Sequence, residues 1–183
     1  SPRYFNMITQ QIPLLGIVAH SGTGKTTLLK QLIPYLRQRG IRTGLIKHTH
    51  HDVDVDTPGK DSFELRKAGA DQTMVASSSR WALMTEMPEQ DHLNLDYLAT
   101  RFDRNKLDMI FVEGFKHEEI DKIVLHREGT GGILEQLIDI HAVAVASDCL
   151  SETISTTISV LNINKIEDVG EFVIRWLENQ QKQ

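Results

Sequence analysis

The sequence predicts an α/β fold of three layers, in which a mostly parallel sheet is flanked by helices. The first apolar segment, residues 12–20, is nearly continuous rather than alternating, which is typical of a strand covered on both faces of a parallel sheet. Apolar residues then recur between Leu28 and Leu36 at the spacing of one helical face. A second strand is expected over residues 41–49, so residues 12–49 form a right-handed βαβ unit.

Strands and helices continue to alternate along the rest of the chain. We expect helices over residues 61–68, over 93–102 and after residue 163, and strands over 72–76, 81–86, 107–112, 122–126, 142–146 and 160–163. The strands over 72–76 and 81–86 are adjacent and form a small hairpin excursion. At roughly 100 to 200 residues per domain, we expect residues 12–183 to form a single domain and residues 1–11 a flexible extension.

The composition excludes several classes of protein. The 183 residues include 20 Lys and Arg against 25 Asp and Glu, a net charge of −5, whereas a general nucleic-acid binder should have a basic surplus. The single cysteine, Cys149, excludes an internal disulfide and suits a reducing compartment. No apolar run is long enough to cross a bilayer. We therefore expect a cytoplasmic protein that binds neither membrane nor nucleic acid.

A glycine-rich segment between the first strand and the first helix predicts a phosphate site. Glycines allow several backbone N–H groups to converge on a phosphate, and the following helix adds its unpaired amides. Lys25 supplies a charge for the β- and γ-phosphates, and the Thr26 hydroxyl is placed to ligate Mg²⁺. The first position of this P-loop pattern is Ala19 instead of glycine. We predict a P-loop NTPase-like fold whose nucleotide contacts are Ser21, Gly22, Thr23, Gly24, Lys25, Thr26 and Thr27.

A carboxylate near the metal is expected at the end of a neighbouring strand. The strand predicted over 107–112 offers two acidic residues. Asp108 opens this strand and falls at the wrong end of the sheet, whereas Glu113 closes it and falls at the ligand end. We therefore predict that Glu113 and Lys25 are the catalytic residues.

Several further motifs closely resemble those of the MobB family, the accessory proteins of molybdopterin-guanine dinucleotide biosynthesis. These motifs are residues 21–27, 47–52, 59–62, 66–70 and 112–116. The resemblance extends from about Ile12 to the last helix. It implies a homodimeric GTP-binding protein with weak GTPase activity, acting beside the guanylyltransferase that joins GMP to molybdopterin. It also makes Glu113 a metal-site carboxylate.

The resemblance implies that residues 47–61 form a segment that senses the γ-phosphate or presents a surface to a partner. Asp52, Asp54 and Asp56 could each reach Mg²⁺ from there, and Asp52 is included in the predicted metal set with Thr26 and Glu113. Residues 56–59 mimic the D-x-x-G element of GTPases, but no long apolar strand precedes them. We interpret them as a Pro-Gly turn.

The residues alone do not show which nucleotide base the chain binds. Residues 164–168 resemble the guanine-reading N-K-x-D motif with one residue too many. Asn164 followed three positions later by Glu167 also fits a helix N-cap, which we favour. Residues 146–148, after a strand, are another candidate for the base pocket. GTP therefore comes from the resemblance, and the residues indicate only a nucleoside triphosphate.

Two other functions remain open. A P-loop small-molecule kinase shares the loop, but such kinases usually carry an Arg-rich lid, and no Arg cluster appears between Arg101 and Arg127. A metal-delivery GTPase would use histidine ligands, and four histidines are candidates for a Zn²⁺ or Ni²⁺ site. They are His20, His48, His50 and His51.

GTP hydrolysis should be slow if no arginine is fixed against the γ-phosphate. Arg66 and Arg80 could supply such an arginine only through a movement or from a second subunit.

Overall fold

The computed structural model describes residues 11–49, 56, 60–89, 92–129, 133–149 and 157–182. The predicted extension over residues 1–11 lies almost entirely outside this part of the chain. The chain divides into two compact units, the larger formed by residues 1–48 and 95–183 and the smaller by residues 49–94. Each unit is described by itself, and the single-domain organisation of residues 12–183 stays a prediction.

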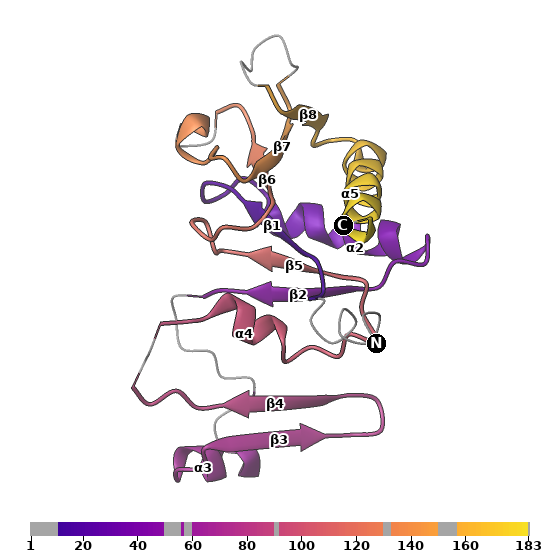
Figure 1. Ribbon diagram of the computed structural model, residues 1–183. Coiled ribbons are helices and arrows are strands. Elements are labelled where there is room, and N and C mark those ends of the chain that lie inside the picture. The colour runs from indigo at the N-terminus through magenta and orange to yellow at the C-terminus, as the bar shows by residue number, and fades with distance from the viewer. Residues whose placement is uncertain are drawn as a thin grey trace. The chain divides into compact units, whose positions relative to one another are not determined.

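The larger unit contains a six-stranded parallel sheet in the order β2-β5-β1-β6-β7-β8 (Figure 1). Its strands are β1 (Leu14–Val18), β2 (Thr43–Lys47), β5 (Met109–Glu113), β6 (Lys122–His126), β7 (Ala142–Ser147) and β8 (Ser159–Asn162). β1 and β2 are not neighbours, because β5 lies between them. Because the three strands are parallel, the carboxyl ends of β1, β2 and β5 lie at one edge of the sheet, where ligands of such folds bind.

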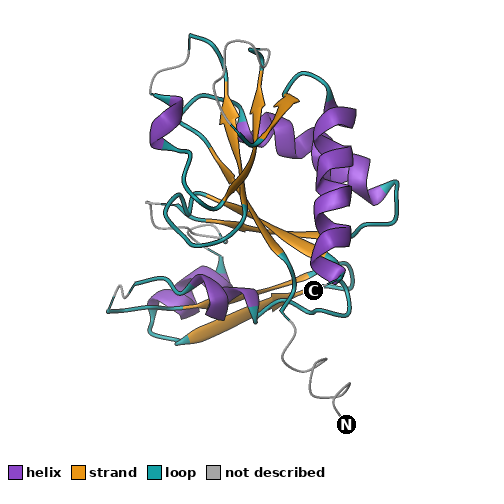
Figure 2. Ribbon diagram, turned by 45° about the horizontal axis from the view of Figure 1, so that its top comes forward, coloured by secondary structure: helices purple, strands orange, loops and turns teal. Residues whose placement is uncertain are grey.

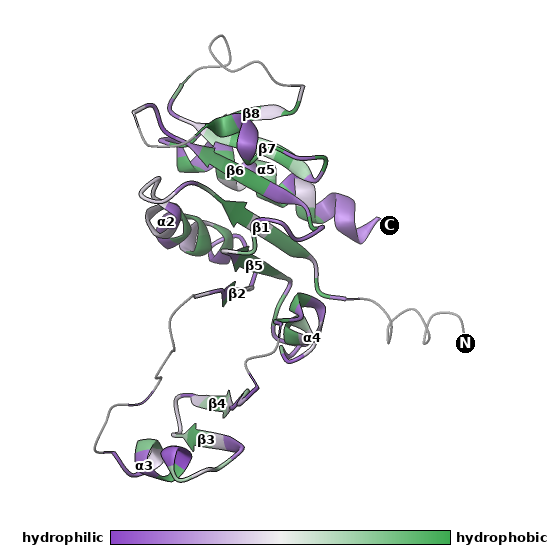
Figure 3. Cartoon of the chain, turned by 90° about the vertical axis from the view of Figure 1, so that its left-hand side faces the viewer, coloured by the Kyte–Doolittle hydropathy of each residue, from purple (hydrophilic) through white to green (hydrophobic). Residues whose placement is uncertain are grey.

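The main apolar core lies between the sheet and two helices, α2 (Lys25–Arg37) and α5 (Ile166–Gln181). Figure 2 shows both helices on the same face of the sheet, and they also pack against each other. All five residues of β5 are buried, as expected for a central parallel strand. In Figure 3 the central strands are correspondingly hydrophobic along their length.

The opposite face of the sheet carries a smaller cluster built on Val18, Val124 and Val145. A short 3₁₀ helix, η1 (Leu134–Gln136), and the residues after it pack against this cluster. A further helix, α4 (Leu95–Ala99), belongs to the same unit and buries both of its end residues. The predicted helix over 93–102 is therefore shorter than expected, because a turn begins at Thr100.

Lys122, at the start of β6, is completely buried. Its ammonium donates to the carbonyl oxygens of Lys116 and Glu118 at 2.9 and 3.1 Å and pairs with the Asp139 carboxylate at 3.0 Å. These bonds tie the loop after β5 to the start of β7. Although partial burial works against the charged form, the hydrogen bonds from Lys122 and from the amide of His141 hold the pKa of Asp139 below its usual value.

The smaller unit contains α3 (Asp61–Lys67) and an antiparallel pair of strands, β3 (Gln72–Ala76) and β4 (Trp81–Thr85). The predicted hairpin excursion is confirmed. Arg66 is buried and pairs with Asp56 at 3.0 Å and with Glu86 at 3.4 Å, which holds α3 beside the hairpin. In the part of the chain that the structure describes, the helices are all too short or too polar to traverse a lipid bilayer.

Candidate nucleotide-binding site

The glycine-rich segment forms a tight loop between β1 and α2, as predicted. Gly22 and Gly24 have φ angles of +82° and +94°, a left-handed backbone that side chains with a Cβ rarely adopt. Gly24 is the N-cap of α2, so the first helical amides have no side-chain cap and face the loop. The positive end of the α2 dipole and these amides provide an anion site.

The polar residues of this loop have different roles. Thr23 is buried, and its hydroxyl donates to the carbonyl oxygen of His20 at 2.7 Å, so it closes the loop onto itself. Lys25 begins α2 and is half-buried, whereas Ser21, Thr26 and Thr27 are exposed. The polar side chains other than Thr23 are thus open to a ligand.

Glu113 lies where the sequence predicted it, at the carboxyl end of β5. It pairs in register with Ile17 of β1 and with Lys47 of β2, and its side chain is 7% exposed. Asp108 is instead beside the start of β2, where its carboxylate accepts a hydrogen bond from the Arg42 amide at 2.7 Å. The two acidic residues of this strand are therefore at opposite ends of the sheet.

The turn after Glu113 depends on glycine. Gly114 has a φ angle of +96°, and a Cβ there would lie 3.1 Å from the carbonyl oxygen of His48. The His48 amide donates to the carbonyl oxygen of Glu113 at 2.9 Å. The chain segments that leave β5 and β2 therefore run close together, and this contact fixes the Glu113 backbone.

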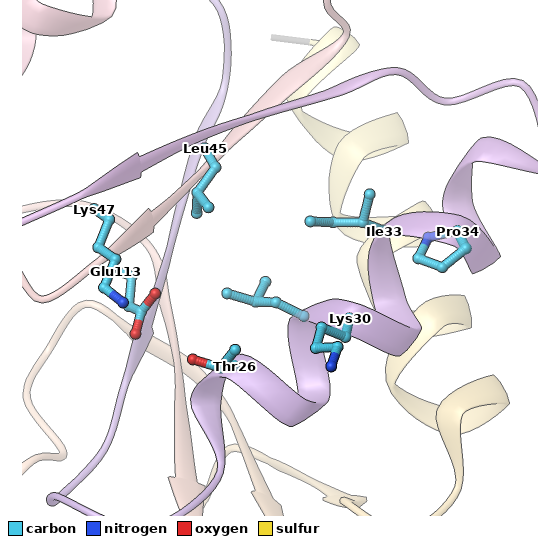
Figure 4. Close-up of a pocket in the computed structure, with 8 residues that line it drawn as sticks. Thr26, Lys30, Ile33, Pro34, Leu45, Lys47 and Glu113 are labelled. Atoms are coloured by element: carbon cyan, nitrogen blue, oxygen red, sulfur yellow. The ribbon is translucent and has the colours of Figure 1, made fainter. Parts of the chain in front are cut away.

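A pocket of about 260 Å³ lies between α2 and the ends of β2 and β5. Figure 4 shows Thr26 from α2 and Lys47 and Glu113 from the strands around it, with Lys47 beside Glu113. The pocket therefore brings together the Thr26 hydroxyl, which is predicted to bind the metal, the Glu113 carboxylate and the positive charge of Lys47. Lys47 was not among the predicted contacts, although it begins the 47–52 motif.

Arg127 is a second residue that sequence reasoning missed. It follows β6, and its guanidinium donates to the carbonyl oxygen of Thr23 at 3.3 Å and to the Asn164 side chain at 3.0 Å. Arg127 therefore connects the phosphate loop to the turn between β8 and α5. No signal in the sequence pointed to Arg127, since an arginine after a strand is common and the contact joins residues 104 positions apart.

The favoured interpretation of Asn164 as a helix N-cap is wrong. The N-cap of α5 is Lys165, without a side-chain cap, and the Asn164 side chain accepts a hydrogen bond from Arg127 instead. The Asp168 carboxylate accepts from the amide of Asn162 and so bridges the turn. The Asn164 side chain therefore contacts Arg127, which also bonds to the phosphate loop.

The other base-pocket candidate, residues 146–148, closes β7. Asp148 accepts a hydrogen bond from the Glu128 amide at 2.9 Å, and this bond is the main reason that its pKa lies below the usual value. Arg127 is also a neighbouring charge that lowers the pKa of Asp148. Both base-pocket candidates therefore lie around Arg127.

The predicted histidine site is only partly described. His20 contacts the carbonyl oxygen of Ile133 at 3.0 Å through Nε2, and His48 stacks on Phe115 with ring centroids 4.9 Å apart. His50 and His51 lie outside the described residues. Over the described ranges, neither His20 nor His48 belongs to a group of three potential metal ligands.

Among the aspartates predicted near Mg²⁺, only Asp56 is described. Asp52 and Asp54, and most of the predicted Pro-Gly turn over 56–59, lie outside the described residues. Asp56 pairs with Arg66 within the smaller unit. Burial opposes its charged form, but hydrogen bonds from Arg66 and Ser62 hold the pKa of Asp56 below its usual value. Arg66 is therefore engaged within its own unit.

Comparisons with known proteins agree on one family. The model of molybdopterin guanine dinucleotide synthesis protein B, MobB, matches residues 14–148. The chain is 61% identical over 170 residues to a molybdopterin-guanine dinucleotide biosynthesis adapter protein of Escherichia coli, covering 92% of this chain and 95% of the relative. It is 46% identical to the adapter protein of the same name from Haemophilus influenzae, with 94% and 93% covered.

Solved structures give the same result for the fold. A crystal structure of molybdopterin-guanine biosynthesis protein B superposes with a TM-score of 0.72 at 26% identity, covering 90% of this chain and 99% of that one. A structure of MobB from Bacillus subtilis has a TM-score of 0.70 at 22% identity, with 89% and 96% covered, and shows the shared fold. The matched sequence, the left-handed glycine loop and the strand order together place the chain in the MobB family, and it belongs to that family.

Proposed function

We propose that this chain is a GTP-binding adapter with weak GTPase activity, which assists a cytoplasmic guanylyltransferase in converting molybdopterin to molybdopterin-guanine dinucleotide. The observation that carries the proposal is the loop from Ser21 to Thr27, with two left-handed glycines at the start of α2. The names of the relatives, which describe adapters of this biosynthesis, support the choice of process.

The site residues fit a triphosphate bound with Mg²⁺. Thr26 offers a hydroxyl and Glu113 a carboxylate at the same pocket, and hard oxygen ligands of this kind suit Mg²⁺. When bound, Mg²⁺ would neutralise charge on the β- and γ-phosphate oxygens. Lys25 would bind the same phosphates, and Glu113 would orient a water molecule held near the metal.

The contacts of Arg66 and Arg127 support slow GTP hydrolysis. Arg66 is paired with Asp56 and Glu86, and Arg127 bonds to the loop carbonyl and to Asn164. An arginine fixed on the γ-phosphate contributes about 10³ to 10⁵ in rate, so we expect slow turnover while these two arginines keep their present partners.

Replacing Glu113 by glutamine is expected to separate binding from hydrolysis. The variant keeps the size of the side chain but loses the charge that positions water, so single-turnover GTP hydrolysis should fall roughly 100-fold. GTP affinity should change only a few-fold, because Lys25 and the loop amides are untouched. Unchanged hydrolysis in Glu113→Gln, or rapid turnover of the wild-type chain without its partner transferase, would contradict the proposal.

A homodimer formed through the β3–β4 hairpin is also part of the proposal. Met74 lies opposite Leu83, and Ala76 opposite Trp81, so one face of the hairpin is apolar. Three of these side chains are 47% to 62% exposed. Two strands alone bury too little apolar surface to be stable, and a second copy would cover this face.

Replacing Trp81 by lysine is expected to weaken such a dimer by tenfold or more, because buried tryptophans contribute strongly to interfaces. Sedimentation velocity over a range of concentrations measures the effect. The matched control is Leu65→Lys, at an equally exposed apolar position on α3 of the same unit. Equal dimer constants for Trp81→Lys and the wild type would place the interface elsewhere.

A further inference from the structure

The ends of β6 and β7 bring together three different kinds of metal-ligating side chain. His126 is the last residue of β6, and Asp148 and Cys149 directly follow β7. One ligand atom of each lies within 4.8 Å of the others. β6 and β7 are neighbouring parallel strands in which His126 pairs with Ser147, so the sheet itself fixes this juxtaposition.

We propose that His126, Asp148 and Cys149 form a binding site for a divalent transition-metal ion of the Zn²⁺ type, with Glu128 as a fourth ligand. The inference does not rest on the proposed function, because metal binding by these residues requires no nucleotide, although Asp148 is also one of the base-pocket candidates.

The distances suit a tetrahedral site. Zn²⁺ binds sulfur at about 2.3 Å and carboxylate oxygen at about 2.1 Å, which sets the two ligand atoms about 3.6 Å apart in a tetrahedron. Cys149 Sγ lies 3.6 Å from Asp148 Oδ1 and 3.9 Å from Glu128 Oε2. Glu128 is not part of the group whose ligand atoms all lie within 4.8 Å of one another, so its carboxylate would have to rotate toward the other three ligands to complete the tetrahedron.

The ligands are also held by a second layer of hydrogen bonds. The Ser147 hydroxyl lies 2.9 Å from His126 Nδ1 and accepts a bond of 2.9 Å from the Cys149 amide. Asp148 Oδ1 accepts from the Glu128 amide. Such contacts orient metal ligands and add to the affinity of known sites. The cluster is therefore organised before any ion binds.

The donor set selects the kind of ion. Imidazole nitrogen and thiolate sulfur favour Zn²⁺ and related transition metals, whereas Mg²⁺ and Ca²⁺ prefer oxygen alone. In the metal-free chain, burial and the neighbouring carboxylates raise the pKa of the Cys149 thiol, although a hydrogen bond with Ser147 lowers it. As the metal–sulfur bond forms, the thiol proton passes to solvent.

The proposed metal site lies outside the phosphate loop in the sequence, but Arg127 links the two in the fold. Arg127, between His126 and Glu128, donates to the carbonyl oxygen of Thr23. Arg127 is also one of the charges that lower the pKa of Asp148, so its guanidinium lies near the cluster as well as near the loop. The metal titration is therefore made without nucleotide.

Titration of the metal-free full chain with Co²⁺, without nucleotide, tests the proposal. Cys149 is the single cysteine of the sequence, so a thiolate-to-cobalt charge-transfer band in the near ultraviolet reports on this residue alone. We expect the band to saturate at one ion per chain and to be displaced by Zn²⁺. Cys149→Ser should abolish it, and His126→Asn should weaken Co²⁺ binding at least tenfold.

The control variant is His141→Asn, which removes a half-buried histidine outside the cluster and should leave the Co²⁺ affinity unchanged. Circular dichroism of each variant verifies the fold. The proposal is overturned if no charge-transfer band appears, or if the band survives unchanged in His126→Asn, which would reveal a lone thiol binding adventitiously. Neither outcome tests GTP binding, which is measured separately with Mg²⁺ as the only metal ion.

Discussion

The Lys25→Ala variant is expected to lose GTP affinity by about 100-fold while it remains folded. A charge-assisted contact to a phosphate contributes about 1.5 to 3 kcal/mol, and the loop amides cannot replace the missing positive charge. Lys25 is half-buried at the first position of α2, where the helix and the loop hold it beside the bound phosphates. Isothermal titration calorimetry with Mg·GTP measures the loss.

The matched control for this variant is Arg37→Ala. It removes one positive charge from the same helix at the last helical residue, which is exposed and about 18 Å along the axis from Lys25. Its GTP affinity should stay within about twofold of wild type, because salt screens a charge at that distance. Equal losses in both variants would mean that general electrostatics, rather than a phosphate contact, governs binding.

Replacing Lys122 by alanine is expected to lower the free energy of unfolding by about 3 kcal/mol, the largest stability effect that we predict. The substitution leaves a cavity where a completely buried side chain stood and removes the donor shared by Lys116, Glu118 and Asp139. Lys122→Met keeps most of the volume but not the donor, so it should be destabilised less. Urea unfolding distinguishes the two, and equal losses would show that the hydrogen bonds alone matter.

The stability of the chain at acidic pH should also reveal the ion pair between Lys122 and Asp139. The pKa of Asp139 is lower in the folded chain than in the unfolded chain, so its charged form stabilises the fold above the unfolded pKa of about 3.9. This contribution is lost as the pH falls below about 4. Lys122→Met should therefore show a shallower loss of stability below pH 4 than the wild type, and parallel acid profiles would contradict the ion pair.

The phosphate loop, the strands and the position of Glu113 could be predicted from the sequence, because each depends on neighbours in the chain. Glycine spacing sets the loop, apolar runs set the buried strands, and a residue that closes a strand must fall at that end of the sheet. The MobB resemblance rested on the same local motifs, and the comparisons confirm it.

The contacts that could not be predicted join distant parts of the chain. Arg127 reaches Thr23 and Asn164, and His126 reaches the residues after β7, only because β6 lies between β1 and β7 in the sheet. The N-cap predicted for Asn164 is wrong for the same reason. The local pattern indicated a cap, but the side-chain oxygen of Asn164 accepts a hydrogen bond from the distant Arg127 guanidinium.

A crystal structure with Mg²⁺ and a non-hydrolysable GTP analogue would show whether the loop from Ser21 to Thr27 binds the triphosphate. We expect the β-phosphate against the amides at the start of α2, the Lys25 ammonium on the phosphates, and the Thr26 hydroxyl and Glu113 around the metal. A nucleotide bound elsewhere, with the loop amides unused and Lys25 turned into solvent, would refute the proposed phosphate site.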